Sequence, residues 1–532
     1  MTADQKAETN HLENVNSNEA EAQHQEITHN DSAPSTWTAL RQNPLIILFC
    51  LYANVGALMY GFDNLILSLS LSMPAFEQKF GSLVNGTYTI PAYWQSLWNA
   101  LSQVATMIGS TVGGFISDRL GRRVAFLVAA CLSSAGFAVV YTANTPGVFL
   151  AGKIINGLAL GIALTTGQTY VSEITPLPLR GIALSAYTFC MNLGYMIAAS
   201  VALPRLTMTT DAAYKVLFAC GWVWPGLLFL FLFLVPESPY FLVANNQPSH
   251  ATRALTRLWT TPALIPGILD EIIRTTEEER LRAAQAEGVS FVDCFRGTHW
   301  RRTRIILYCN ALPQVIGSSF MTNGPYFLVQ AGMSAGKIGM MTEIGIAFGI
   351  ASSLVTGWAM TVFGRRTLVL FGMGLSTGLF TVMGVAGCFP QSSAALWVVG
   401  IFLQLSWWVY GPGIGPAMAI AGEVSAVRLR AKSLAVGFTF NYFFSTVWNV
   451  VMPYLYNSDE ADLGGLIGWI FAGMGAVMFV VLFLELPETK GRSFEELDEL
   501  FGARVAARKF AEFQCERTVG LAVRKGVDES TQ

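Results

Sequence analysis

Twelve apolar segments, each long enough to cross a lipid bilayer, are the feature that most limits what this chain can fold into. A spanning helix needs about 20 predominantly apolar residues. Such segments begin near Pro44, Tyr93, Val124, Gly147, Ile182, Val216, Thr303, Lys337, Thr367, Ala394, Ser433 and Leu463. In hydrocarbon, backbone polar groups must be satisfied within the segment, so runs of this kind form helices. With 52% hydrophobic and only 13% charged residues, the chain is predicted to be an all-α integral membrane protein.

The polar stretches between these segments divide the chain into five parts. Residues 1–43 are rich in Asn, Glu, Gln and Ser and predict a disordered tail. Residues 44–235 and 303–486 each hold six apolar segments. Residues 236–302 predict a cytoplasmic helical linker, because TTEEERLRAAQAE has an amphipathic pattern, and residues 487–532 form a C-terminal tail.

The short loops indicate how the chain is oriented. The basic sequences RLGRR, LPLRG, RRTR, GRR and RLRAK all fall on one side of the predicted membrane. Cytoplasmic loops carry an excess of Lys and Arg, so this side and both termini are expected in the cytoplasm. Asn85, in Asn-Gly-Thr, then lies in the first external loop as a candidate glycosylation acceptor, although a single such triplet also arises by chance.

Several classes of function lack support in the residues. The eight cysteines are scattered without a CxxC or Cys/His cluster, and the five histidines all lie outside the apolar segments. No GxxxxGK[ST], HExxH or GxSxG pattern occurs. We therefore expect neither an enzyme nor a cofactor or metal, and the net charge of -2 gives no reason to expect nucleic acid as a partner. The lipid bilayer is the expected environment.

Three sequence motifs occur twice, in the same order, once in each half. GGFISDRLGRR (113–123) matches GWAMTVFGRR (357–366), SEITPLPLRG (172–181) matches GEVSAVRLRA (422–431), and PESPYF matches PETKGR. The repetition predicts two pseudo-symmetric six-helix bundles that work by alternating access. These motifs resemble those of the sugar porter family of the major facilitator superfamily over about residues 45–502. YGFDNLILSLSLSMPAF and PETKGRSFEELDELF further resemble the fungal branch of maltose and α-glucoside permeases.

The resemblance implies a transporter of a sugar or related polyhydroxylated solute, expected in the plasma membrane. It also implies a gating network of charges on the cytoplasmic face that is made when this face closes. Its members would be Asp118, Arg122, Arg123, Glu173, Arg180 and Glu237 in the first half, and Arg365, Arg366, Glu423, Arg430 and Glu488 in the second. Thr361 stands where the family usually has an acid, so the second network lacks one anion. The alternative is that the arginines only fix topology.

Proton coupling is expected at Asp63, the one acidic residue of the first apolar segment. A charge inside a membrane is unfavourable unless it faces a cavity or a partner. The resemblance places Asp63 at the coupling position of symporters, and Lys153 replaces the arginine that is its usual partner. Alternatively, Asp63 lies near an aqueous opening, Lys153 extends to the interface, and the protein is a facilitative carrier.

The resemblance also implies substrate-binding positions between the halves, and several of them have changed. Pro313 and Ser319 replace a glutamine and an asparagine, Thr188 replaces a glutamine and Met418 replaces a tryptophan. The full set of expected substrate-binding residues is Gln168, Thr188, Asn192, Gln314, Ser318, Ser319, Met418, Asn441 and Ser445. Each of these side chains could instead serve helix packing.

The loss of long amides leaves the solute open. An α-glucoside, a polyol and a glycosylated or oxygenated specialised metabolite all remain candidates, moved in either direction, and a sugar-sensing transceptor is a further alternative. Glycines and prolines at 411–416 predict an interruption of the tenth helix that could serve as a gate hinge.

Overall fold

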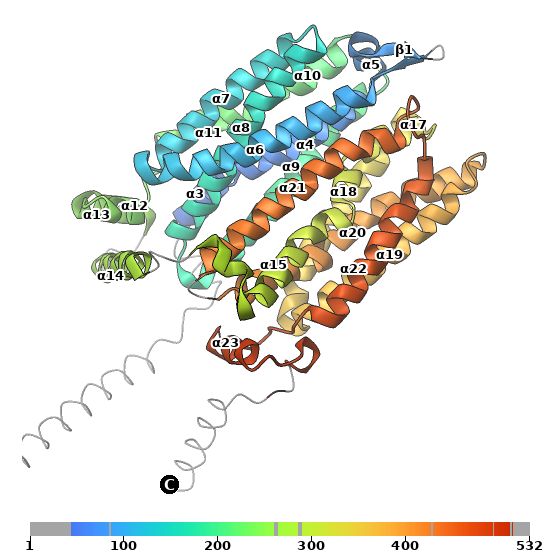
Figure 1. Cartoon of the computed structure of the whole chain (residues 1–532). Helices are drawn as coiled ribbons and strands as arrows, with labels where there is room; N and C mark the ends of the chain where they lie inside the picture. Colours follow the sequence, from blue (N-terminus) through green and yellow to red (C-terminus); the bar gives the residue numbers. More distant parts are fainter. Residues whose placement is uncertain are drawn as a thin grey trace, which may run out of the picture.

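The helices form two bundles that lie side by side (Figure 1). A computed structural model of the chain describes residues 44–84, 87–259, 264–285, 290–426, 429–492, 494–510 and 513. Eleven helical segments in this part of the chain are long and apolar enough to cross a membrane. The twelfth predicted segment is α6 (Ala92–Leu120), a helix of 29 residues that carries more polar side chains. The predicted all-α fold of twelve membrane-spanning helices is confirmed.

The first bundle contains six spanning segments. They are α3 with α4 (Pro44–Ala53, Val55–Leu71), α6, α7 (Arg122–Thr142), α8 (Pro146–Ile174), α9 (Leu177–Ala202), and α10 with α11 (Ala212–Cys220, Val223–Leu232). The short helix α5 (Pro74–Phe80) and a hairpin of β1 (Ser82–Val84) and β2 (Thr87–Thr89) connect the first two segments, with Leu83 opposite Tyr88. A 3₁₀ turn, η1 (Leu203–Arg205), follows α9.

Three helices lie between the bundles in sequence and project from one end of the molecule (Figure 1). They are α12 (Pro239–Ala244), α13 (Pro248–Leu258) and α14 (Ile265–Gln285), followed by the 3₁₀ turn η3 (Phe291–Phe295). Residues 275–285 of the expected amphipathic helix lie within α14, and residues 286 and 287 lie outside the described part of the chain. The next spanning segment begins at Gly297, six residues before the boundary predicted at 303.

The second bundle repeats the arrangement. Its spanning segments are α15 to α17 (Gly297–Val315, Ser318–Thr322, Gly324–Gln330), α18 (Ala335–Val362), α19 (Arg365–Gly387), α20 (Ser393–Val424), α21 (Arg430–Tyr456) and α22 (Ile467–Glu485). The turn η5 (Gly464–Leu466) precedes α22, and α23 (Phe494–Gly502) and η6 (Ala507–Lys509) follow it. The halves meet where α6 packs on α21 and α9 packs on α18.

Close helix packing in the first bundle depends on glycine. A Cβ added at Gly161 of α8 would lie 2.1 Å from the carbonyl oxygen of Thr106 on α6. A Cβ added at Gly61 of α4 would lie 2.0 Å from the carbonyl oxygen of Met191 on α9. Without a side chain, these helices approach backbone to backbone, as small residues allow in membranes.

The seventh spanning segment is broken, and the tenth is not. Gly317 between α15 and α16 has φ +81°, a left-handed conformation that favours glycine. The predicted interruption of the tenth helix is wrong, because α20 runs without a break through Pro412 and Pro416. Pro412 has no N–H to donate to the carbonyl of Trp408, and the hydroxyl of Ser352 on α18 donates to that carbonyl instead.

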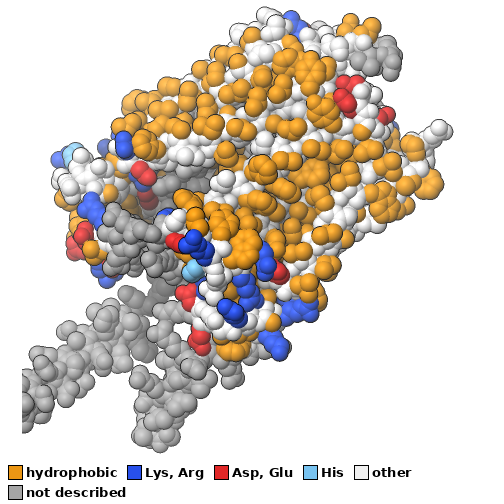
Figure 2. Space-filling model, in the orientation of Figure 1, with side chains coloured by type: hydrophobic (Ala, Val, Ile, Leu, Met, Phe, Trp, Pro, Cys, Tyr) orange, Lys and Arg blue, Asp and Glu red, His pale blue; other side chains and the backbone are white. Residues whose placement is uncertain are grey.

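The two ends of the molecule differ in character. We call the end with α12–α14 and α23 the basic end, and the end with β1 and β2 the hairpin end (Figure 1). In Figure 2 hydrophobic side chains cover the long faces of both bundles, and most of the visible Lys and Arg side chains gather at the basic end. This distribution suits a protein whose long faces contact lipid.

Candidate functional site

A buried ion pair joins the first and fourth spanning segments. The Nζ atom of Lys153 on α8 lies 2.6 Å from Oδ2 of Asp63 on α4, and both residues are 3% exposed. Asn156, one turn after Lys153, donates from Nδ2 to Oδ1 of Asp63 over 2.8 Å. The hydroxyl of Ser133 on α7 donates to Oδ1 of Asn156 over 2.9 Å. The carboxylate is therefore paired and hydrogen-bonded, as a charge buried in a membrane must be.

The structure thus brings together the two residues expected to act in coupling. It adds Asn156 and Ser133, which sequence reasoning missed. The three-residue spacing of Lys153 and Asn156 places both on one face of a helix, and this was the signal that could have identified Asn156. No comparable spacing points to Ser133, which lies on a different helix.

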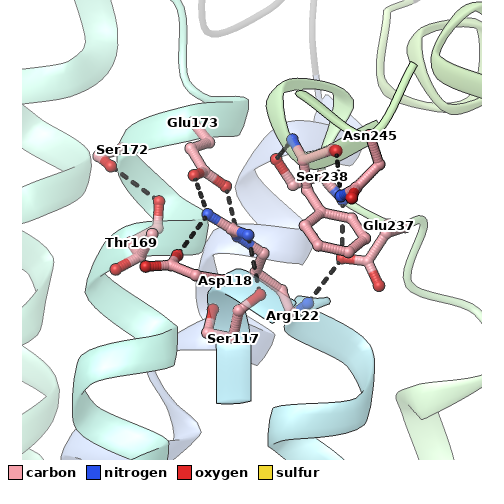
Figure 3. Close-up of polar contacts among 10 residues, drawn as sticks. Ser117, Asp118, Arg122, Thr169, Ser172, Glu173, Glu237, Ser238 and Asn245 are labelled. Carbon is pink, nitrogen blue, oxygen red and sulfur yellow. Dashed lines mark hydrogen bonds and ion pairs between the residues drawn. The ribbon is translucent and has the colours of Figure 1, made fainter. Parts of the chain in front are cut away.

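Five of the six expected gating residues of the first half meet at the basic end (Figure 3). Arg122, at the start of α7, contacts both carboxylate oxygens of Glu173, with Nη2 2.6 Å from Oε1 and Nε 2.9 Å from Oε2. Asp118 lies one turn earlier, 3.4 Å from Nη2. Glu237 accepts the backbone N–H groups of Arg122 and Arg123 over 2.9 and 3.2 Å. Gly121 is required here, because its φ is +96° and an added Cβ would lie 2.6 Å from Glu237.

The second half repeats this geometry. Glu488 accepts the backbone N–H groups of Arg365 and Arg366 over 3.0 and 3.1 Å. Arg365 pairs with Glu423 over 2.8 Å, as Arg122 pairs with Glu173. An added Cβ at Gly364 would lie 2.2 Å from the carboxylate of Glu488, so a side chain there would displace this carboxylate from the turn.

Some expected gating contacts are not seen. The ion pairs of Arg122 with Asp118 and Glu173 join residues of the first half, and that of Arg365 with Glu423 joins residues of the second half. Arg430 donates from Nε to the hydroxyl of Ser425 over 3.1 Å. The side chain of Arg180 and the candidate glycosylation residue Asn85 lie outside the described part of the chain.

The expected substrate-binding residues lie on helices of both halves, and several bond to one another. Oε1 of Gln314 accepts from the hydroxyl of Ser319 over 2.7 Å. Nδ2 of Asn441 donates to the carbonyl of Asn310 over 2.6 Å. Nδ2 of Asn192 lies 3.5 Å from Oγ of Ser353 in the other half. Amide groups already used in this way are less available to a solute.

The remaining expected substrate-binding residues have fewer such bonds. Ser445 accepts from Nδ2 of Asn449 over 3.3 Å. Gln168, Thr188, Ser318 and Met418 are half-buried, and the structure gives their side chains no hydrogen bond among the described residues.

Half-buried tyrosines from four helices face one another between the halves. Tyr60 on α4, Tyr187 on α9, Tyr410 on α20 and Tyr442 on α21 are close enough for their hydroxyl groups to interact electrostatically. Sequence reasoning named Tyr442, together with Tyr326, Trp407 and Trp408, as side chains that could flank a solute ring, and it missed the other three tyrosines of this group.

Buried polar side chains join the two halves at the hairpin end. We call Gln95, Tyr326, Tyr456 and Asn457 the hairpin-end latch; each is at most 1% exposed. The hydroxyl of Tyr326 accepts from Gln95 over 3.2 Å and donates to Oδ1 of Asn457 over 3.1 Å. The hydroxyl of Tyr456 donates to Oε1 of Gln95 over 3.2 Å. The carbonyl of Ile90 accepts from Gln95 over 2.7 Å and from Asn457 over 3.0 Å, so the latch holds this end closed.

A carboxyl with a shifted pKa lies near the latch. Burial raises the pKa of Glu77 on α5 to about 7, because desolvation disfavours its charged form. Glu77 interacts electrostatically with Tyr326. The hairpin end therefore carries one group that changes charge near neutral pH.

Removing one hydroxyl tests the latch. Tyr326→Phe keeps the edge contact with the Tyr456 ring, whose centroid lies 5.7 Å away, and loses the bonds to Gln95, Gln330 and Asn457. Each lost bond and unsatisfied partner costs about 1 kcal/mol or more, so the loss of all three is expected to raise the population open at this end roughly a hundredfold or more. Spin labels at Leu83 and Gln391, in a background without native cysteines, should report a longer distance. Tyr88→Phe, on the exposed hairpin, is the control, and an unchanged distance distribution in Tyr326→Phe would refute the latch.

Comparison with known proteins agrees with this geometry. A family model described as "Sugar (and other) transporter" matches residues 49–501. The MFS transporter fmqE of Aspergillus fumigatus is 30% identical over 90% of this chain and 91% of its own length. The general alpha-glucoside permease of Saccharomyces cerevisiae is 29% identical over 89% of this chain and 78% of its own length.

Solved structures share the fold. The xylose transporter XylE from E. coli in an inward open conformation aligns with a TM-score of 0.66 at 20% identity, covering 86% of this chain and 99% of the other. A XylE structure described as a proton:xylose symporter bound to 6-bromo-6-deoxy-D-glucose aligns with a TM-score of 0.64 at 22% identity, with the same coverage. At these identities the likeness concerns the fold alone.

Proposed function

The chain belongs to the sugar transporter family of the major facilitator superfamily, and we propose that it moves an α-glucoside or a related sugar by alternating access in symport with protons. It is a multi-pass membrane transporter and not an enzyme. The observation that carries the coupling proposal is the pair of Asp63 and Lys153, paired over 2.6 Å and 3% exposed. The names of the α-glucoside permease and of the proton:xylose symporter support the choice of solute and of coupling ion.

The buried pair suggests how a proton is coupled to the conformational change. While Asp63 is ionised, Lys153 and Asn156 satisfy its carboxylate, and α4 and α8 are held together. Protonation of Asp63 removes the attraction to Lys153 and frees both helices to move. Because both side chains are closed off from water in this conformation, proton exchange requires a second conformation in which they are exposed.

The closed and open ends define the conformational cycle. The hairpin-end latch joins the halves at one end, whereas the ion pairs of Arg122 and Arg365 at the basic end stay within each half. This arrangement fits a conformation closed at the hairpin end. In the opposite conformation the latch breaks and the networks at the basic end, with Arg180 and Arg430, meet across the halves.

The orientation follows from the charges. The basic end carries the Lys and Arg residues of the short loops, so we place it and both termini in the cytoplasm. The hairpin end then faces outward, with Asn85 as a glycosylation acceptor. We place the protein in the plasma membrane; sugar and protons are its partners, and nucleic acid is not.

A second candidate solute is a glycosylated or oxygenated metabolite, or a polyol. It is favoured by the aromatic surface of Tyr60, Tyr187, Tyr410 and Tyr442 and by the internal bonding of Gln314 and Asn441. Ring faces bind apolar solute surfaces, whereas a simple hexose needs several free donors and acceptors.

Counterflow in proteoliposomes distinguishes these solutes. Vesicles preloaded with unlabelled maltose, another α-glucoside, a hexose, a polyol or an aryl glycoside are tested for accelerated entry of the same labelled compound. We expect counterflow with an α-glucoside, and it needs no proton gradient. Counterflow confined to the aryl glycoside would favour the second candidate, and its absence for every compound with folded protein would refute the proposed solute class.

A further inference from the structure

The charges at the basic end are balanced in the first half of the molecule. Three carboxylates and three arginines lie at or next to the turn between α6 and α7. They are Asp118, Glu173 and Glu237, and Arg119, Arg122 and Arg123.

The equivalent turn of the second half has too few anions. Thr361 occupies the position of Asp118, and Val362 that of Arg119. The ammonium group of Lys490 lies at this position and donates to the carbonyls of Thr361 and Val362 over 2.8 and 2.9 Å. Where the first half holds a carboxylate, the second half therefore holds a cation.

Two further cations gather beside Lys490. The guanidinium groups of Arg366 and Arg508 lie 5.7 and 4.5 Å from the centroid of the same ring, that of Phe483, and they repel each other electrostatically. We call Arg366, Lys490 and Arg508 the basic triad. Arg508 and Lys490 are exposed, and Arg366 is half-buried.

The nearby carboxylates are already engaged. Glu423 pairs with Arg365 over 2.8 Å. Glu488 accepts four backbone N–H groups, those of residues 365, 366, 489 and 490, over 3.0 to 3.1 Å. Among the described residues, no carboxylate lies within ion-pair distance of any member of the basic triad.

The basic triad lies where the lipid-facing surface ends. Trp358, Phe363, Phe483 and Leu484 are between 44% and 62% exposed, and they continue the apolar surface of α18 and α22 to this point. In Figure 2 Lys and Arg side chains lie at the lower edge of the hydrophobic surface. This is the level at which phospholipid headgroups are found.

The segment that carries Arg508 is fixed to the bundle. Arg492 donates to the carbonyl of Phe510 over 2.9 Å, and Arg301 on α15 donates to the carbonyl of Val505 over 2.7 Å. Phe510 is fully buried and packs edge to face on Phe501. Arg508 is therefore held beside Arg366, and among the described residues neither guanidinium group has a carboxylate within ion-pair distance.

We propose that the basic triad binds the phosphate of an anionic phospholipid headgroup, which supplies the anion that the second half lacks. Arginine binds phosphate oxygens in a forked geometry, and lysine adds a point charge. Anionic lipids also concentrate positive side chains at the cytoplasmic surface of a membrane. The acyl chains would pack on the apolar surface around Phe483 and Leu484.

Native mass spectrometry of the full-length protein tests this proposal. The detergent-purified protein is equilibrated with mixed micelles of phosphatidylserine and phosphatidylcholine, and retained lipids are counted. We expect a preference for phosphatidylserine of roughly tenfold or more that Arg508→Gln largely removes. Thr361→Asp should reduce retention as well, because it restores the carboxylate present in the first half. Arg274→Gln, on exposed α14, is the control and should change nothing.

Three outcomes would overturn the proposal. The first is equal retention of the two lipids by the wild type. The second is undiminished retention of phosphatidylserine by both Arg508→Gln and Thr361→Asp. The third is displacement of the lipid by inorganic phosphate in millimolar excess, which would indicate a site for a free anion. None of these measurements depends on which solute is transported.

Discussion

Replacing Asp63 by asparagine is expected to abolish accumulation of solute against a gradient while exchange across the membrane continues. Asparagine keeps the size of the side chain and can still bond to Asn156, but it cannot bind or release a proton. If Asp63 carries the coupled proton, uptake in Asp63→Asn will stop at equal concentrations inside and outside. The measurement is uptake of labelled solute into proteoliposomes with an imposed proton gradient, followed by exchange without one.

Glu343 provides a matched control for this experiment. It is a half-buried carboxyl within α18, so Glu343→Gln makes the same chemical change inside the other bundle. Glu343→Gln should still accumulate solute. Full uphill uptake by Asp63→Asn would show that coupling lies elsewhere.

Replacing Lys153 by methionine is expected to cause the largest loss of stability. The buried Asp63 carboxylate then loses the ammonium group of Lys153 and keeps the hydrogen bond from Asn156. Breaking a buried pair by removing one partner costs about 3–5 kcal/mol. The melting temperature in detergent at neutral pH should fall by many degrees.

The double variant Asp63→Asn, Lys153→Met separates charge from packing. It contains neither buried charge, so it should be markedly more stable than Lys153→Met alone. A Lys153→Met protein as stable as the wild type, or a double variant no more stable than Lys153→Met, would mean that the two side chains are not energetically coupled.

The membrane fold could be predicted from the sequence because each spanning helix corresponds to one long, continuous run of apolar residues. The resemblance to the sugar porters named the members of the two charge networks but not their pairings, which the structure gives as Arg122 with Glu173 and Arg365 with Glu423. The pairing of Asp63 with Lys153 followed from the resemblance to the sugar porters, since 90 residues separate them.

The hairpin-end latch could not be predicted. Its members lie on α6, on α17, at the end of α21 and directly after α21, and no sequence pattern connects these positions. The position of the helix break was misjudged for a related reason. Glycine and proline at 411–416 weaken a helix in isolation, but Ser352 of α18 satisfies the carbonyl that Pro412 leaves free. The seventh segment breaks at Gly317, which has a positive φ. A single glycine in an apolar run is not enough to predict such a break.

Proton movement on addition of solute tests the proposed symport most directly. Proteoliposomes of the purified protein are suspended in weakly buffered medium containing a pH indicator, and an α-glucoside that shows counterflow is added outside. If Asp63 carries the coupled proton, the medium becomes more alkaline with the wild type and with Glu343→Gln. With Asp63→Asn the pH of the medium does not change. Entry of the same solute with no pH change in the wild type would contradict the proposed symport and identify a facilitative carrier.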